Sequence, residues 1–395
     1  MAIRRLQDVN VKGKRVLCRV DFNVTLDKQT GEVDDDTRVV AVLPTLRDLA
    51  ARGARIVVCS HFQRPKGKRV PEMSLKPVVA NLSKHLGKPI AFADDCIGPA
   101  VEAAVAKLKD GDVLLLENLR YHAGEEKDDP ELAKQLAALA DIYVNDAFGA
   151  AHRAHASVHA IAKLMPARCA GLLMQKEIDS LSPLLGQPAR PFVAILGGAK
   201  ISGKLQVIVN LLPKCDSMLI GGGMAYTFLK AQGMPIGKSL VEADLVAKAG
   251  EILAEAKRLG KTFLLPLDHV VAEKFEANAP SKVVPADGIP EGSMALDIGP
   301  RTVARYSQEI AKAKTVIWNG PQGVFELEPF NKGTFAIAQA VASCGAHTVV
   351  GGGESVAAVN AAGVADRITH ISTGGGASLE FLEGQTLPGV AALES

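Results

Sequence analysis

The chain has 395 residues with a formal net charge of +2, and 48% of its residues are hydrophobic against 22% charged. This composition is typical of a globular protein, and the near balance of charge gives no general argument for nucleic-acid binding. No apolar run is long enough for a signal peptide or a membrane span, so the sequence predicts a cytoplasmic protein without membrane partners. A chain of this length favours two domains.

Cysteine usage supports a reducing compartment. The six cysteines are Cys18, Cys59, Cys96, Cys169, Cys215 and Cys344. They form no C-x-x-C pair, and several of them lie in apolar runs of strand length. They are therefore predicted to be small buried side chains without disulfides.

Apolar runs of strand length alternate with helical patterns through the first half of the chain. The runs occupy residues 15–22, 54–60, 89–93, 112–118 and 141–148. Such alternation predicts a parallel sheet with helices on both faces.

A helical pattern separates the two halves. Residues 169–191 carry apolar positions at helical spacing, closed by Gly186 and Pro188, and we interpret about 171–187 as an interdomain helix. The second half repeats the first plan, with runs at 191–198, 217–222, 261–268, 315–320, 347–353 and 368–373. The predicted fold is therefore α/β, with two doubly wound, Rossmann-like lobes; if their strand ends face each other, the active site is the cleft between them.

Charged and polar side chains follow the predicted strands of the first half. They are Asp21, Asn23, Arg38, His61, Arg64, Arg120, His122, His152, Arg153 and His155. Several arginines from separate loops favour a site for a small, multiply charged anion, because guanidinium groups bind carboxylate and phosphate bidentately. Each arginine taken alone is also consistent with a solvated surface charge, and each histidine with a structural donor.

Three triple-glycine tracts follow apolar runs in the second half, at 221–223, 351–353 and 374–376. A glycine turn into a helix lets backbone N–H groups approach a phosphate, although glycine there also permits tight packing. Together the three tracts favour a nucleotide-sized ligand.

The segment from Gly198 to Lys204 has the G-x-x-x-x-G-K spacing of a P-loop. Leu205 stands where a P-loop needs a hydroxyl for magnesium, which disfavours a Walker-type NTPase. Lys200 and Lys204 nevertheless suit a phosphoryl group, or else are two surface lysines in a turn.

An ordered set of motifs spans the whole chain and resembles the phosphoglycerate kinase family. The motifs are RVDFNV (19–24), SHFQRPKG (60–67), LLENLRYHAGEEKDDPELAK (115–134), VNDAFGAAHRAHAS (144–157), ILGGAK (195–200), GGGMAYTFLKAQG (221–233), DIGP (297–300), TVIWNGPQGVFE (315–326), GGGESVAAVN (351–360) and ISTGGGASLEFLEG (371–384). The resemblance implies a phosphoglycerate-binding lobe over 1–170 plus 381–395, and a nucleotide-binding lobe over 171–380. It also implies that the segment after about Glu380 packs back on the first lobe.

The resemblance assigns roles residue by residue. Substrate contacts would be made by Asp21, Phe22, Asn23, Arg38, His61, Phe62, Gln63, Arg64, Arg120 and Arg153. Catalytic positions would be Arg38, Lys200, Gly375 and Gly376. Nucleotide contacts would be made by Gly198, Ala199, Lys204, Gly222, Gly223, Asn319, Glu326, Gly352, Gly353, Glu354 and Ser355, with Glu354 also the magnesium ligand. The chain departs from the commonest family pattern at Gly203 and Glu354, both aspartate in that pattern, which changes where oxygen ligands can reach a metal.

The implied reaction is reversible, magnesium-dependent phosphoryl transfer between 1,3-bisphosphoglycerate and ADP, giving 3-phosphoglycerate and ATP. No aspartate of a kinase catalytic loop is present, and a carboxylate acceptor needs none because it is already ionised at neutral pH. The resemblance further implies a monomer with small-molecule partners. Two alternatives remain open at this stage: an NAD-dependent dehydrogenase, whose G-x-G-x-x-G pattern the glycine tracts do not fit, and a non-catalytic two-lobed anion-binding protein.

Overall fold

The computed structural model of the chain describes residues 3–394, which divide into two compact units. Unit 1 runs to Asp179 and resumes at Thr386, and unit 2 spans Ser180–Gln385. The first division falls inside helix α6 (Leu172–Leu185), later than the predicted 170/171. The start of α6 is held by unit 1, because the backbone N–H groups of Leu172 and Met174 donate to Thr45 and Asp146.

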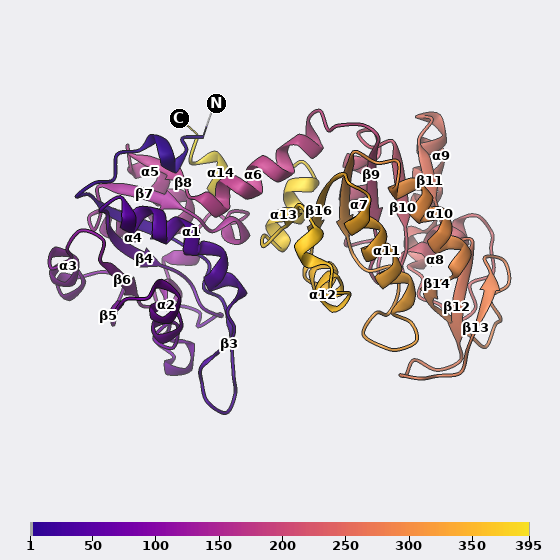
Figure 1. Ribbon diagram of the computed structural model, residues 1–395, viewed down its shortest axis with the longest axis horizontal. Coiled ribbons are helices and arrows are strands. Elements are labelled where there is room, and N and C mark those ends of the chain that lie inside the picture. The colour runs from indigo at the N-terminus through magenta and orange to yellow at the C-terminus, as the bar shows by residue number, and fades with distance from the viewer. Residues whose placement is uncertain (1–2, 395) are drawn as a thin grey trace. The chain divides into compact units, whose positions relative to one another are not determined.

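Unit 1 is built on a six-stranded parallel sheet with the order β5-β6-β4-β1-β7-β8 (Figure 1). Its strands are β1 (Arg15–Arg19), β4 (Arg55–Cys59), β5 (Ala91–Ala93), β6 (Val113–Leu116), β7 (Ile142–Asn145) and β8 (Arg168–Ala170). The short antiparallel pair β2 (Thr25–Leu26) and β3 (Val33–Asp35) lies outside this sheet. The four strands β6, β4, β1 and β7 are neighbours, so the loops after them meet at one edge of the sheet.

Both faces of this sheet are buried. Val16 and Cys18 of β1 share a hydrophobic core with α1 residues such as Leu46, whereas Leu17 points to the opposite face. On that opposite face Tyr143 of β7 donates its hydroxyl to the backbone of Ser157. The helices of unit 1 are α1 (Thr37–Ala51), α2 (Val78–Leu86), α3 (Pro99–Ala106), α4 (Pro130–Ala137), α5 (Ile161–Leu164) and α14 (Pro388–Ala391), with a π-helical turn η6 at Ala156–Ala160.

Residues 386–394 belong to unit 1, and this return begins later than the predicted residue 381. Helix α14, yellow in Figure 1, lies among the indigo and magenta elements of unit 1. The backbone N–H of Gly389 donates to the carbonyl of Ala151, and Glu394 pairs with Ile3 in an isolated bridge. A side chain at Gly389 would lie 2.4 Å from Val158, so this return needs a glycine.

Unit 2 contains a second six-stranded parallel sheet, with the order β11-β10-β9-β15-β16-β17. Its strands are β9 (Phe192–Leu196), β10 (Ser217–Ile220), β11 (Thr262–Leu264), β15 (Thr315–Asn319), β16 (His347–Gly351) and β17 (His370–Ile371). The helices of unit 2 are α7 (Leu205–Leu211), α8 (Ala225–Ala231), α9 (Val246–Arg258), α10 (Pro300–Ile310), α11 (Lys332–Ser343), α12 (Gly353–Ala361) and α13 (Gly376–Leu382). The two parallel sheets confirm the predicted α/β fold.

An antiparallel sheet in unit 2 was not predicted. It consists of β12 (Asp268–Ala272), β13 (Ser281–Pro285) and β14 (Met294–Ile298), in the order β13-β12-β14. The prediction of one strand over 261–268 is wrong beyond Leu264, where β11 ends. Pro266 has no N–H to donate to a neighbouring strand, and Asp268 is the first residue of β12.

Between residues 3 and 394, no helix has both the length and the apolar character that crossing a membrane requires. The six cysteines are free thiols, of which Cys344 is half-buried and the others are buried. The prediction of buried, unbridged cysteines is confirmed for those five.

Candidate functional site

The anion-binding candidates of unit 1 come together at the carboxyl edge of its sheet. Asp21 and Asn23 follow β1, His61–Arg64 follow β4, Arg120 follows β6 and Arg153 follows β7. Because these strands are adjacent and parallel, the predicted cluster becomes one group of loops.

Asp21 and Asn23 organise the loop after β1. Asp21 forms an ion pair with Arg38 of α1 and accepts a hydrogen bond from the backbone of Asn23. Burial opposes ionisation of Asp21, but the guanidinium groups of Arg38 and Arg19 and the backbone N–H of Asn23 outweigh it and hold the pKa of the carboxyl below its ordinary value. The Asn23 side chain in turn accepts from the backbone N–H of Gln63, which joins the loops after β1 and β4.

His61 is hydrogen-bonded to a buried arginine. Arg19, the last residue of β1, is 1% exposed, and its Nη2 lies 3.1 Å from His61 Nδ1. Arg19 also donates to the carbonyl of Val20 and to the hydroxyl of Ser157. Burial lowers the pKa of His61 well below its ordinary value. His61 therefore remains neutral at physiological pH.

Arg120 is fixed by its surroundings, whereas two other predicted arginines are exposed. Arg120 Nη1 donates to the carbonyl of Gln63 at 2.6 Å, and Arg120 Nε lies 3.5 Å from a carboxylate oxygen of Glu126. Arg64 and Arg153 are exposed. Gln63 itself has a φ of +51°, a left-handed conformation that turns the loop at this point.

Phe22 and Phe62, two predicted substrate contacts, have buried side chains. Both side chains are buried in the hydrophobic core of unit 1, at 0% and 1% exposure. The backbone of Phe62 is also engaged, because Asn118 both donates to its carbonyl and accepts from its N–H. These two residues support the loops and have no side-chain surface to offer a ligand.

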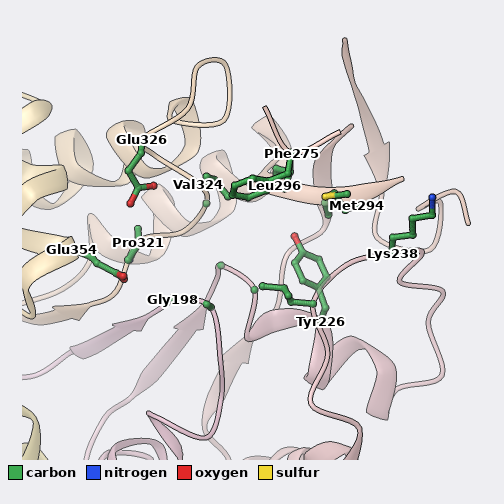
Figure 2. A pocket seen from close by; sticks show the side chains of 16 residues that line it. Gly198, Tyr226, Lys238, Phe275, Met294, Leu296, Pro321, Val324, Glu326 and Glu354 are labelled. Atoms are coloured by element: carbon green, nitrogen blue, oxygen red, sulfur yellow. The ribbon is translucent and has the colours of Figure 1, made fainter. Parts of the chain in front are cut away.

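Unit 2 contains a pocket of about 410 Å³ that brings many of the predicted nucleotide residues together (Figure 2). Its lining includes Gly198, Ala199, Gly222, Gly223, Glu326 and Glu354. The opposite part of the lining is apolar and comes from Leu240, Phe275, Met294, Leu296 and Val324. A pocket of this size with an apolar wall and a few polar groups suits a nucleotide.

The first triple-glycine tract is required by packing. A Cβ at Gly222 would lie 2.6 Å from the carbonyl oxygen of Gly198, and one at Gly223 would lie 2.6 Å from that of Ala199. The backbone N–H of Gly222 donates to Gln322, and that of Met224 donates to Gly198. The glycines therefore let the loops after β9 and β10 pack directly on each other beneath the pocket.

The two predicted lysines differ in environment. Lys204 is half-buried and donates to Asn319 Oδ1, and burial lowers its pKa although Glu354 and Glu383 oppose the shift. The Nδ2 atom of Asn319 is buried without a hydrogen-bond partner among residues 3–394, which leaves a donor for a bound anion. Lys200 is exposed at the tip of the loop after β9.

The second glycine tract opens helix α12. Gly352 has a φ of +88°, Glu354 is exposed in the first turn, and Glu354 also lines the pocket. Ser355 is buried, and its hydroxyl accepts from the backbone N–H of Gly320 at 2.5 Å. The Ser355 hydroxyl thus holds the loop after β15, and the predicted nucleotide contact of Ser355 stays a prediction for its backbone.

The third tract leads into α13, which begins at Gly376. Gly375 has a φ of +53° and so turns the chain into the helix. The backbone N–H of Gly374 donates to the hydroxyl of Ser372, which also bonds Ser378. Gly375 and Gly376 are exposed.

Sequence reasoning missed two features of the site. Arg19 belongs to the quoted RVDFNV motif, but nothing in the pattern distinguishes it from a surface arginine on a strand end. The apolar wall was also missed, because Met294 and Leu296 belong to the unpredicted antiparallel sheet and Phe275 to a loop.

Comparison with known proteins gives a consistent result. A family model described as "Phosphoglycerate kinase" matches residues 6–385. The chain is 58% identical to a phosphoglycerate kinase from Moorella thermoacetica, over 100% of this chain and 99% of the relative. It is 57% identical to the one from Koribacter versatilis, over 98% of each chain.

Solved structures similar to this chain belong to the same family. The structure of phosphoglycerate kinase from Coxiella burnetii is similar with a TM-score of 0.92 and 40% identity, covering 99% of each chain. That from Pyrococcus horikoshii has a TM-score of 0.84 and 34% identity, covering 98% of each. The dehydrogenase and the non-catalytic anion-binding protein find no support in these comparisons. The chain belongs to the phosphoglycerate kinase family.

Proposed function

We propose that the chain catalyses reversible phosphoryl transfer from the acyl phosphate of 1,3-bisphosphoglycerate to ADP, giving 3-phosphoglycerate and ATP. The observation that carries the proposal is the family match over residues 6–385. Two relatives, at 57% and 58% identity, are named phosphoglycerate kinase. The charged loops of unit 1 and the pocket of unit 2 supply sites of matching chemistry.

Unit 1 would bind the phosphoglycerate. Arg64, Arg120 and Arg153 offer guanidinium groups for its phosphate, and the Asp21–Arg38 pair borders its carboxyl end. His61 would donate a hydrogen bond as a neutral imidazole, since burial lowers its pKa.

Unit 2 would bind the nucleotide in its pocket. The apolar wall with Phe275 and Leu296 suits the base, and Glu326, which also lines the pocket, would accept hydrogen bonds from the ribose hydroxyls. Lys204 and the unpaired Nδ2 of Asn319 would meet the phosphates. Glu354 fits magnesium, which binds through one or two carboxylates together with phosphate oxygens; the metal would neutralise phosphate charge.

The chemistry needs charge neutralisation and alignment. In the direction that consumes ATP, a carboxylate oxygen of 3-phosphoglycerate bonds to the γ-phosphorus, and the bond from that phosphorus to the bridging oxygen breaks, with its electrons passing to the departing ADP. No general base is required, because a carboxylate with a pKa of about 3.5 is already ionised. Arg38 and Lys200 would stabilise the transferring phosphoryl group as it carries charge between the two oxygens.

The test is a coupled assay for ATP formation from 1,3-bisphosphoglycerate and ADP with magnesium. ATP formation that depends on enzyme and on both substrates supports the proposal. A folded preparation that binds ADP but forms no ATP contradicts it. We also propose that the active species is a cytoplasmic monomer, for which size-exclusion chromatography with light scattering gives the mass.

A further inference from the structure

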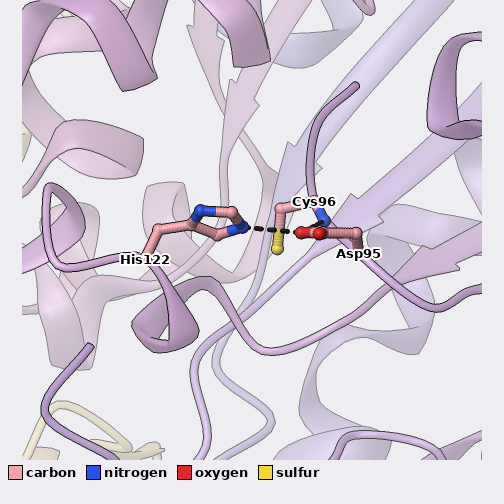
Figure 3. Close-up of side chains that lie close together, drawn as sticks. All are labelled: Asp95, Cys96 and His122. Carbon is pink, nitrogen blue, oxygen red and sulfur yellow. Dashed lines mark hydrogen bonds and ion pairs between the residues drawn. The ribbon is translucent and has the colours of Figure 1, made fainter. Parts of the chain in front are cut away.

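Asp95, Cys96 and His122 converge at the carboxyl edge of the unit 1 sheet, beside the proposed substrate loops (Figure 3). Asp95 and Cys96 follow β5, and His122 follows the 3-10 turn η3 (Leu119–Tyr121) after β6. Strands β5 and β6 pair in parallel, which brings the two loops together. Each side chain offers one ligand atom, and the three atoms lie within 4.8 Å of one another.

The contacts show an inner and an outer part of this cluster. The Cys96 thiol is fully buried and donates to the carbonyl of Glu117 at 2.8 Å. His122 Nε2 lies 2.6 Å from Asp95 Oδ1, and these side chains are 25% and 49% exposed. The thiol is therefore the inner group, and the imidazole and carboxylate are partly exposed to solvent.

The spacing and the donor set suit one type of ion. Zinc binds thiolate sulfur at about 2.3 Å and imidazole nitrogen or carboxylate oxygen at about 2.0–2.2 Å, so in a tetrahedral site two of its ligand atoms are roughly 3.3–3.7 Å apart. The three atoms lie within 4.8 Å of one another, and the His122 and Asp95 atoms, 2.6 Å apart, would separate to admit the ion. Magnesium and calcium prefer oxygen ligands, whereas mixed sulfur, nitrogen and oxygen ligands favour zinc. We propose that Asp95, Cys96 and His122 form a binding site for Zn²⁺, with the fourth position filled by water.

Binding has a defined proton balance. The S–H bond of Cys96 breaks, its proton passes to solvent, and a sulfur–zinc bond forms. His122 binds through Nε2 as a neutral imidazole, with its proton on Nδ1. Because the Cys96 thiol gives up its proton when zinc binds, the affinity rises with pH.

The site would tie two segments of unit 1 together. Its ligands join the loop after β5 to the segment that carries Arg120, because His122 directly follows η3. Zinc should thus raise the midpoint of thermal unfolding by binding only the folded state. The proposal is independent of the proposed function, since its readouts are metal binding and stability.

The experiment titrates the full chain, freed of metal with a chelator, with zinc chloride by calorimetry in two buffers of different ionisation enthalpy. We expect one saturable site, with proton release that makes the measured enthalpy differ between the two buffers. Cobalt(II) used in place of zinc should give a thiolate-to-cobalt charge-transfer band. Cys96→Ser should abolish the band. It should also weaken zinc binding by more than about 100-fold, because loss of a residue that only hydrogen-bonds to a metal ligand already costs about 10–100-fold.

Matched controls exist in the same chain. His85 Nε2 lies 2.7 Å from Asp36, and the side chains are 25% and 42% exposed, so this pair resembles His122–Asp95 without the thiol. His85→Gln and Cys344→Ser should leave the affinity and the band unchanged. Absence of a saturable site, or a band that persists in Cys96→Ser, overturns the proposal. If Cys96→Ser does not fold, His122→Gln decides in its place: a loss of affinity supports the site, and unchanged binding overturns it.

Discussion

Arg19 fixes the tautomer of His61. The guanidinium can only donate, and its Nη2 lies 3.1 Å from His61 Nδ1, so Nδ1 must accept and the ring proton must reside on Nε2. The buried Arg19 thus keeps His61 as a neutral donor whose free N–H is the one left for a substrate. Arg19 acts through His61 and is a positioning residue.

We predict that Arg19→Gln raises the KM for phosphoglycerate by about tenfold or more, equivalent to about 1.4 kcal/mol, with a smaller effect on kcat. In the parent, nitrogen NMR shifts of His61 should show protonated Nε2 and no titration from pH 8 to pH 5.5. In the variant, the ring should lose this fixed tautomer.

Arg15→Gln is the matched control, because Arg15 lies on the same strand but forms an exposed pair with Asp141. Arg19→Lys should rescue the KM in part, since lysine can also donate. An unchanged His61 spectrum in Arg19→Gln would remove the positioning role.

Lys200→Ala is expected to lower kcat by on the order of 100-fold or more, with little change in either KM. The reason is that the ammonium of Lys200, exposed at the tip of its loop, is free to follow the phosphoryl group. Lys204→Ala should instead raise the KM for the nucleotide, since Lys204 is held on Asn319. Steady-state kinetics of both variants separate these effects. Lys248→Ala, an exposed lysine on α9, should match the parent, and full turnover in Lys200→Ala would exclude it from the chemistry.

Glu354→Gln should shift the magnesium concentration for half-maximal activity upward by about tenfold or more, because a neutral amide is a weaker ligand than a carboxylate. A role limited to the helix dipole would instead cost about 0.3–1 kcal/mol of stability and leave the metal dependence unchanged. Titration of activity with magnesium distinguishes the two. Glu102→Gln, in the first turn of α3, provides the control for the dipole effect.

Stability of unit 2 should depend on Asp297. Burial raises the pKa of this carboxyl to about 8, against about 3.9 in an unfolded chain. Between these values the folded state binds more protons than the unfolded state, so Asp297 makes the unit less stable as the pH rises from about 4 to about 8.

Asp297→Asn mimics the protonated form and should flatten this dependence, measured as the urea midpoint at pH 5 and pH 8. The exposed Asp244→Asn serves as control. A midpoint in Asp297→Asn that falls with pH as steeply as in the parent would contradict the assignment.

The central strands were predictable from sequence for a physical reason. A parallel sheet buries both faces, so strands such as β1, β4, β9 and β15 are continuous apolar runs that stand out from their neighbours. Strand β13 does not, because four of its five residues are exposed and it lies at the edge of a small sheet. The apolar wall of the pocket therefore escaped prediction together with the sheet that carries part of it.

The candidate site was predictable as a set of residues but not as a set of roles. Ser355 and Phe62 stand in the expected motifs, yet one holds a backbone N–H and the other fills the core. Burial and hydrogen-bond partners decide such roles, and both depend on residues distant in the sequence. Arg19 shows the same limit, since its partner His61 lies on another strand end.

The return of residues 386–394 to unit 1 has a consequence for synthesis on the ribosome. Unit 2 is a continuous stretch, Ser180–Gln385, and all of it has been made before the last segment of unit 1 is translated. The contact of Gly389 with Ala151 cannot form until the whole of unit 2 has been translated. The unit that begins first is therefore completed last, and termination before Gly389 would leave its surface around Ala151 and Val158 uncovered.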